Sequence, residues 1–475
     1  MSLTRRGLLG AGAAAAAGTG LAALGFPGPA VADSDTQCAG LIPAVAEAPP
    51  GGRIDLHAHH IPPVYREALL QAGMVTIGGY PTPVWSPERA IAFMDSFGIQ
   101  LQVVSLSDPG VSFLSGAAAK TLARQVNEYT AELIKDHPTR FGGYAVLPLP
   151  DVEGSLEELA YALDVLKLDG VALLTSYGGT NIALPQFEPL WAEINRRKAF
   201  VFMHPAALPA DDKPSYGLPD FLVEFTFETT RFCAVALNTA LTTRYPDLRI
   251  QLAHAGGAFP FLNYRVGVMQ DGAANQVLKD PDSVNGVLPA AQQRGFYYDT
   301  ALNPAPSAMQ SVLEISDINH IVFGSDWPFT ELLFVVPGDP QPPLSATFAT
   351  SQRHAIERAN PLAQLPSVAA RLGVPAADTA VDAKLVRARV IKQKAGKRQV
   401  RFLLDAGETV LVDAQLTRAG KMLAETRFSR VDRGRRSLRF TLPPDLRPGK
   451  ARLVLSVTDV FGNIRTVRTS IHVID

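Results

Sequence analysis

Eight short apolar runs, each followed by a polar or Gly/Pro break and a helix-length stretch, recur between residues 53 and 325. Most are continuous runs of β-branched and aromatic residues, which is typical of strands buried on both faces of a parallel sheet. Stretches between them, such as 120–135 and 155–167, have helical patterning. Eight strands alternating with helices predict an α/β fold of the (β/α)₈ TIM-barrel type. The predicted strands are 53–58, 100–106, 141–148, 170–175, 199–204, 248–254, 296–301 and 320–325.

An open doubly wound sheet is the alternative fold for the same alternation of strands and helices. We rank it lower, because the first predicted strand is not followed by the Gly-rich phosphate-binding fingerprint of that fold. We therefore expect a barrel over residues 53–375, with Gly-Val-Pro at 373–375 marking its end.

The pattern changes beyond the barrel. Between residues 383 and 475 apolar and polar residues alternate, and turn signals such as Ala-Gly-Lys at 395–397 and Arg-Pro-Gly at 447–449 interrupt the alternation. A period of two indicates strands with one buried face. Six or seven such strands predict a small β-sandwich of immunoglobulin-like or fibronectin-like type over residues 383–475.

The two predicted domains differ in charge. The whole chain has a formal net charge of -1, which gives no reason to expect nucleic acid as a partner. Residues 384–475 nevertheless hold 21 of its 44 lysines and arginines but only 8 of its 45 aspartates and glutamates. The simplest interpretation is a solvated strand face rich in arginine. The alternative is that the basic sandwich docks onto the acidic barrel or onto an anionic cell-envelope polymer.

The N-terminus has the features of a targeting segment. Arg5 and Arg6 precede an apolar run rich in alanine and glycine, and Ala-Val-Ala at 30–32 provides a cleavage site. This pattern resembles a twin-arginine signal peptide over residues 1–32 and predicts an exported, periplasmic or extracellular protein; a general secretory signal is the alternative. A linker over 33–52 follows, and we expect no transmembrane segment in the mature chain.

Polar residues close four of the predicted strands. His57 and His59 end the first strand, two residues apart and therefore on one side of it. His204 ends the fifth, His254 the sixth and Asp326 the eighth. Such residues are costly in a core but suit a metal site, and the carboxyl ends of barrel strands are where active sites form. We therefore expect a metal-dependent active site there.

These motifs resemble a known family. Asp-Leu-His-Ala-His at 55–59, His-Ala-Gly-Gly-Ala-Phe-Pro at 254–260 and Gly-Ser-Asp-Trp-Pro at 324–328 are similar to motifs of the amidohydrolase superfamily. The resemblance covers about residues 53–374 and is strongest to the amidohydrolase-related decarboxylases, such as aminocarboxymuconate-semialdehyde and 6-methylsalicylate decarboxylases. The export signal and the sandwich are not part of the usual pattern of this branch.

The resemblance implies a ligand set and a metal count. It assigns His57, His59, His204 and Asp326 as metal ligands, and it places His254 beside the metal as an acid/base residue. Binuclear members carry a lysine at the end of the fourth strand, whereas this strand ends Leu-Leu-Thr-Ser at 173–176. We therefore expect one divalent ion, preferably Zn²⁺, with Mn²⁺ as the alternative.

The resemblance also implies an activity: a metal-dependent non-oxidative decarboxylase, or carboxy-lyase, acting on a small aromatic or unsaturated carboxylic acid. His254 and Asp326 are its candidate catalytic residues. A metal-dependent hydrolase of a lactone, amide or ester uses the same residues and stays open, as does a binding protein with an inactive barrel.

A substrate-binding residue and an oligomeric state follow from the same resemblance. Arg265, beyond the sixth strand, matches an arginine that binds the substrate carboxylate in the resembling decarboxylases. A surface arginine on a helix is the alternative. The family also implies a homodimer.

Overall fold

The computed structural model describes residues 46–49, 51–209, 213, 216–275, 295–333, 338–374, 381, 383–392, 397–407, 410–431, 434–458 and 464–474. The predicted signal peptide and most of the predicted linker lie outside these residues. Within the described part of the chain, no helix has the length and apolar character needed to cross a bilayer.

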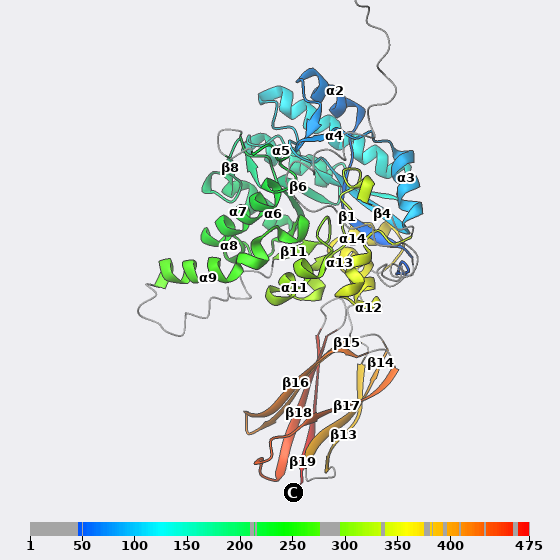
Figure 1. Cartoon of the computed structure of the whole chain (residues 1–475), viewed down its shortest axis with the longest axis vertical. Helices are drawn as coiled ribbons and strands as arrows, with labels where there is room; N and C mark the ends of the chain where they lie inside the picture. Colours follow the sequence, from blue (N-terminus) through cyan, green and yellow to red (C-terminus); the bar gives the residue numbers. More distant parts are fainter. Residues whose placement is uncertain are drawn as a thin grey trace, which may run out of the picture. The chain divides into compact units, whose positions relative to one another are not determined.

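Eight parallel strands form one sheet that curves into a nearly closed barrel (Figure 1). The sheet is closed by β1 and the segment after β12: the backbone N–H of Leu56 donates to the carbonyl of Phe323 at 2.9 Å, and Ala58 bridges Trp327 in parallel. All eight predicted strands are confirmed. In sheet order they are β1 (Arg53–His59), β4 (Ile99–Ser105), β5 (Phe141–Ala145), β6 (Gly170–Leu174), β9 (Phe200–His204), β10 (Arg249–Leu252), β11 (Phe296–Asp299) and β12 (Ile321–Val322).

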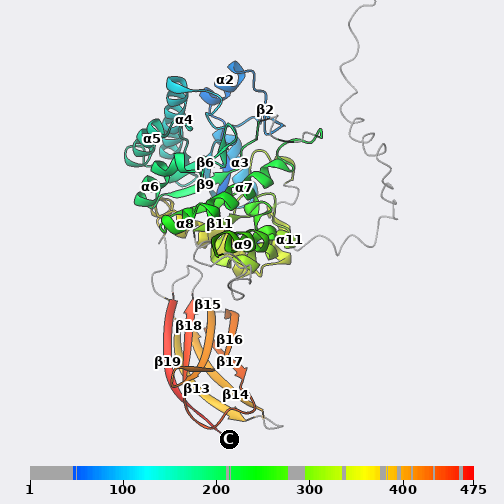
Figure 2. The same cartoon turned by 90° about the vertical axis from the view of Figure 1, so that its left-hand side faces the viewer.

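Helices surround the strands, as the predicted barrel requires (Figures 1 and 2). Several begin at local signals in the sequence: the Ser86 hydroxyl accepts the Arg89 N–H at the start of α3, and the Asp151 carboxylate accepts the Gly154 N–H at the start of α5. The α-helices are α2 (Pro63–Gln71), α3 (Pro87–Ser96), α4 (Gly116–Asp136), α5 (Val152–Asp164), α6 (Glu188–Arg197), α7 (Glu224–Asn238), α8 (Leu241–Arg244), α9 (Phe259–Asn275), α11 (Pro306–Ile315), α12 (Thr350–His354), α13 (Asn360–Gln364) and α14 (Pro366–Arg371).

A buried layer of polar side chains supports the carboxyl end of β1. The Asp55 carboxylate accepts the amide of Gln102 at 3.0 Å and both the N–H and the hydroxyl of Ser325. On the other side of β1, Gln251 donates to the Leu56 carbonyl at 3.2 Å. The Asp55 carboxylate and both amide N–H₂ groups thus find partners within the layer directly below the strand ends that carry the histidines, whereas the Oε1 atoms of Gln102 and Gln251 are buried without one.

A cluster of four buried charges holds the amino end of β1. The Arg53 guanidinium lies 3.1 Å from the Glu357 carboxylate, and Arg353 lies 2.8 Å from Asp339 and 2.5 Å from Glu357. All four side chains are nearly inaccessible to solvent. The cluster therefore fixes the first strand against the segment that follows the last one.

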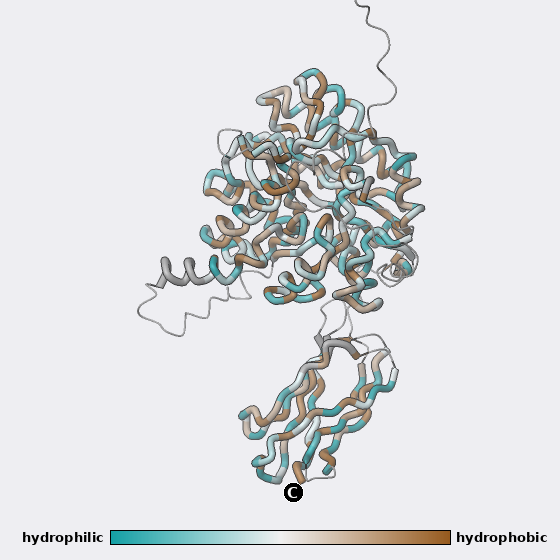
Figure 3. The backbone as a smooth tube through the Cα atoms, viewed as in Figure 1, coloured by the Kyte–Doolittle hydropathy of each residue, from teal (hydrophilic) through white to brown (hydrophobic). Residues whose placement is uncertain are grey.

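Seven antiparallel strands form the C-terminal domain, which confirms a β-sandwich of the predicted size. A three-stranded sheet (β13-β14-β17) and a four-stranded sheet (β16-β15-β18-β19) face each other (Figure 2) and share one apolar core. Hydrophobic and hydrophilic residues alternate along their strands (Figure 3). The strands are β13 (Ala383–Lys392), β14 (Arg398–Ala406), β15 (Val410–Arg418), β16 (Lys421–Val431), β17 (Gly434–Thr441), β18 (Gly449–Thr458) and β19 (Ile464–Val473).

Replacing Arg353 tests the buried charge cluster. Arg353→Met should lower the free energy of unfolding of the barrel by about 3–5 kcal/mol, because it leaves the Asp339 and Glu357 carboxylates buried without their common partner. All three tryptophans precede residue 375, so urea unfolding followed by tryptophan fluorescence reports on the barrel. The control is Lys135→Met, whose loss of the pair with Glu132, exposed on both sides, should change this free energy little. If both variants had the same free energy of unfolding, the buried charge cluster would not be what stabilises the barrel.

Candidate metal centre

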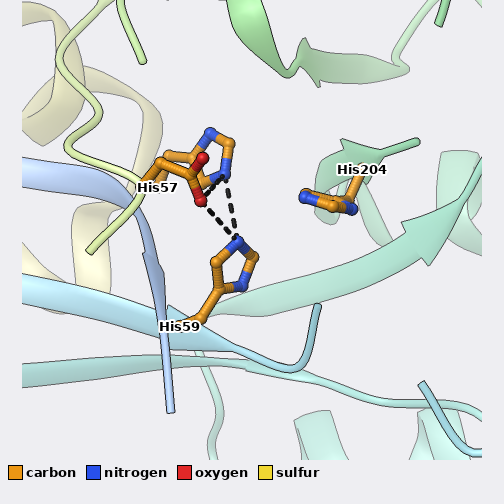
Figure 4. A group of neighbouring side chains, drawn as sticks. His57, His59 and His204 are labelled. Atoms are coloured by element: carbon orange, nitrogen blue, oxygen red, sulfur yellow. Dashed lines mark hydrogen bonds and ion pairs between the residues drawn. The ribbon is translucent and has the colours of Figure 1, made fainter. Parts of the chain in front are cut away.

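Three histidines and one aspartate meet at the carboxyl ends of the barrel strands. His57 and His59 come from β1, His204 ends β9, and Asp326 follows β12. One ligand atom from each lies within 4.8 Å of all the others, and all four side chains are buried. The His59 Nε2 atom is 3.2 Å from His57 Nε2 and 3.2 Å from an Asp326 carboxylate oxygen (Figure 4). The sequence prediction that these four side chains converge is confirmed.

The three imidazoles are oriented by hydrogen bonds at their other ring nitrogen. The Nδ1 atom of His57 is 2.8 Å from the Asp299 carboxylate, and that of His204 is 2.7 Å from the Pro205 carbonyl. The Nδ1 atom of His59 is 3.1 Å from the Ser105 hydroxyl. Each contact leaves Nε2 directed at the common centre. Metal-binding histidines in proteins show this arrangement, so the donor set fits a divalent ion.

Asp299, the last residue of β11, is a site residue that the sequence analysis missed. Its carboxylate contacts the His57 ring, accepts the amide of Gln251 at 2.9 Å, and accepts the backbone N–H groups of His254 and Ala301. A signal was present: Asp299 is the one charged residue in the predicted strand 296–301. The same rule that singled out the other strand ends would have found it.

The local charges favour a cation at the centre. Burial acts to lower the pKa of His57, but the carboxylates of Asp299 and Asp326 outweigh it and raise that pKa to about 10. Burial acts to raise the pKa of Asp326, yet His57 and the hydrogen bonds from the neighbouring imidazoles hold it well below its ordinary value. Burial and the adjacent imidazoles lower the pKa of His204. The two buried carboxylates therefore stabilise a positive charge at the centre, and a divalent ion would replace the proton on His57.

His254 stands beside this group rather than within it. Its Nε2 atom is 3.4 Å from the second Asp326 carboxylate oxygen. The backbone of His254 and that of Asp326 both adopt the left-handed region, with φ of 56° and 58°. Non-glycine residues seldom adopt this conformation, and it concentrates at functional sites. Hydrogen bonds from the His254 N–H to Asp299 and from the Asp326 N–H to the His57 carbonyl hold the two backbones in place.

A cavity of about 200 Å³ opens onto the site. His204, His254 and Asp326 reach it from the strand ends, and most of the remaining wall is apolar or aromatic. No lysine or arginine belongs to its lining in the described part of the chain. The other lining residues are Ile77, Tyr80, Ser107, Phe221, Phe225, Leu302, Phe329, Thr330 and Leu333.

Other residues singled out in the sequence lie outside the cavity. Arg265 is exposed on α9 and is not part of the lining, so its role in substrate binding stays a prediction. His60 turns away from the centre and contacts the Ser105 carbonyl and the Thr130 hydroxyl, as a structural residue would. Trp327 is buried and stacks on Phe93.

Comparisons with known proteins identify the family of the barrel. The amidohydrolase (Amidohydro_2) family model matches residues 54–366. A decarboxylase of Aspergillus niger is 37% identical over 291 residues, covering 58% of this chain and 77% of its own length. The 6-methylsalicylic acid decarboxylase of Penicillium expansum is 33% identical over 280 residues, covering 58% and 85%.

A solved structure supports the fold. The dihydroxybenzoic acid decarboxylase of Polaromonas sp. JS666, which contains bound manganese and an inhibitor, superposes with a TM-score of 0.53 at 22% identity and covers 68% of this chain and 97% of its own. The family match ends before the sandwich. The chain therefore belongs to the amidohydrolase family, in the branch that includes the 6-methylsalicylic acid decarboxylases.

Proposed function

We propose that this protein is a metal-dependent non-oxidative decarboxylase of a small aromatic monocarboxylic acid. The observation that carries the proposal is the apolar cavity of about 200 Å³ whose polar end is the His/Asp cluster. The two relatives cited above, at 37% and 33% identity, are named decarboxylases and support the same activity. Nothing in the cavity favours the hydrolase alternative, which becomes an outcome of the test below.

The size and lining of the cavity favour a single-ring substrate. An apolar cavity of about 150 Å³ admits benzene, whereas pockets for drug-sized ligands have about 300–1,000 Å³. Phe225, Phe329 and Leu302 provide an apolar wall suited to an aromatic ring and an alkyl substituent. No lysine or arginine lines the described cavity, so among its lining residues only those of the centre can hold the group that balances the substrate carboxylate. This favours a monocarboxylate over a muconate-type diacid.

His57, His59, His204 and Asp326 would hold one divalent ion. Imidazole and carboxylate ligands suit both Zn²⁺ and Mn²⁺. Described strand β6 (Gly170–Leu174) has no lysine or glutamate that could bridge a second ion. When bound, the ion supplies Lewis-acid chemistry and a fixed positive charge for the substrate's oxygen atoms.

We assign the proton transfer to His254. Its ring lines the cavity, and its backbone is held by Asp299 and by the Asn303 amide, which donates to the His254 carbonyl at 2.8 Å. In the proposed reaction a proton from Nε2 of His254 adds to the ring carbon that bears the carboxylate. The bond from that carbon to the carboxylate then breaks, CO₂ leaves, and the electron pair restores the aromatic ring. Asp326, which also lines the cavity, is the second candidate donor. Because its pKa is held well below the ordinary value, it would first have to take a proton from the adjacent His254.

The proposal keeps several expectations from the sequence. We propose export through the twin-arginine segment at 1–32, a homodimer, and an immunoglobulin-like or fibronectin-like type for the sandwich. Substrate binding by Arg265 is also retained, from a position outside the described cavity.

A substrate panel tests the activity. Metal-loaded protein should release CO₂ from 6-methylsalicylate and related monohydroxybenzoates, and release it more slowly from muconates, because the cavity offers no second cation. Chelator should abolish the release, and Zn²⁺ or Mn²⁺ should restore it. CO₂ and product mass should be followed together. A product one water heavier, formed from a lactone without CO₂, would establish the hydrolase instead.

Replacing His254 tests the proton donor. His254→Ala should lower kcat by about 10²–10⁴-fold, the usual contribution of a general acid or base, while the metal content stays near that of the parent. His472→Ala, which removes an exposed imidazole on β19, is the matched control and should leave both unchanged. Loss of metal from the His254 variant would show that this residue is a ligand.

Replacing Asp299 tests the support of the metal ligand. Asp299→Asn removes the carboxylate that orients His57, so metal affinity should fall by about 10–100-fold. Competition with a chromophoric chelator measures this affinity. Asp247→Asn, which changes a carboxylate with 47% of its side chain exposed, should leave the affinity unchanged. If both variants bind metal equally well, Asp299 does not support the ligand set.

A further inference from the structure

The outer face of the three-stranded sheet in the sandwich carries a row of three arginines. In the sheet register Arg389 of β13 lies opposite Arg401 of β14, and Arg401 lies opposite Arg439 of β17. All three side chains are exposed. Neighbouring strands are about 5 Å apart, so the row places three positive charges side by side across the whole sheet. We call this face, with Arg387 and Lys384 beside the row, the arginine face.

In the described part of the sandwich, no compensating charge accompanies the row. Among the described residues, no carboxylate lies within ion-pair distance of Arg389, Arg401 or Arg439. The only acidic side chain that the register places on this face, Asp405, is bound to Arg435 at 2.9 Å. Like charges directly opposite one another destabilise a sheet, so this row costs stability.

Protection of the sheet edges does not explain the row. Charged side chains on edge strands discourage strand-to-strand aggregation, which would account for Arg389 on β13 and Arg439 on β17. Arg401, however, lies on β14, the central strand of this sheet. A cation on the central strand cannot prevent an edge strand from pairing with another chain. A binding role for the continuous row accounts for all three.

We propose that the arginine face binds a linear acidic polysaccharide through its carboxylates. Guanidinium groups pair with carboxylates in a bidentate geometry, and a linear polymer offers negative charges at short, regular intervals. Beside the row, the Ser437 hydroxyl accepts from Arg401 Nε at 2.8 Å and the Thr441 hydroxyl accepts from the Gln399 amide at 3.2 Å. Each hydroxyl keeps its own hydrogen, which can be donated to a sugar oxygen. The surface lies in the domain outside the matched family region, and the proposal does not depend on the decarboxylase activity.

The chemistry of the face separates this partner from two other polyanions. Surfaces that bind single-stranded nucleic acid combine cations with aromatic side chains for base stacking, and the register places no aromatic residue on this face. Surfaces that bind membranes combine basic residues with exposed apolar side chains that insert into the lipid. Here Ile391 and Leu403 are half-buried among the arginines, and a single valine, Val386, is the exposed large apolar side chain in the described part of these three strands. One valine offers little apolar area to insert into lipid.

Binding of the full chain to polygalacturonate, with dextran as the neutral polymer, tests the proposal. The parent should bind polygalacturonate but not dextran, and more weakly as salt is added. The triple variant Arg389→Gln, Arg401→Gln, Arg439→Gln should bind at least about tenfold more weakly. Its matched control is Lys450→Gln, Arg452→Gln, Arg468→Gln, which removes three exposed cations from the outer face of the other sheet. The control should keep its affinity within about twofold.

Thermal unfolding separates binding from a structural role. Because the row is repulsive, the arginine triple variant should unfold at the same temperature as the parent or at a higher one. A lower unfolding temperature would show that the arginines stabilise the sheet and would overturn the proposal. So would absence of polygalacturonate binding, or equal losses in the two triple variants. Tighter, arginine-dependent binding to single-stranded DNA or to phosphatidylglycerol vesicles would assign the face to that partner instead.

Discussion

The carboxylate of Asp299 is the contact on which the site depends. It contacts Nδ1 of His57 on β1, and it accepts hydrogen bonds from the Gln251 amide on β10 and from the backbone N–H of His254. One buried charge thus orients a candidate metal ligand and the candidate proton donor at once. A buried carboxylate is costly without partners, and here four hydrogen-bond donors surround it. The contacts that orient His57 and His254 are therefore also the ones that compensate the burial of the Asp299 carboxylate.

The rest of the barrel keeps this arrangement rigid. The Arg53–Glu357 pair fixes the amino end of β1, and the Asp55 carboxylate binds the Ser325 N–H below the histidines. Backbone bonds from Leu56 and Asp326 then close the barrel between its first and last strands. Because His57 and His59 lie on the first strand and Asp326 lies on the segment that follows the last one, closure of the barrel is itself what brings them together.

The cavity has a polar end and an apolar wall. The polar groups gather at the strand ends, whereas the wall is built from aromatic and aliphatic side chains such as Phe225 and Phe329. In the proposed reaction an apolar ring would leave water for this wall, which is favourable, and its charged group would face His204, His254 and Asp326. The sandwich contributes a second, separate surface whose charge comes from strand register rather than from a pocket.

Much of this protein was determined by the sequence alone. The eight apolar runs define the barrel strands, and the polar residues that end four of them define the four clustered side chains and His254, because parallel strands deliver their carboxyl ends to one face. The alternating pattern after residue 383 defines the sandwich strands. Only the tertiary structure decided which groups meet across the chain. Asp299 lies 242 residues from His57, and the three arginines come into line only through the pairing of β13, β14 and β17. Register and ring closure depend on how separate segments pack, and no local pattern encodes them.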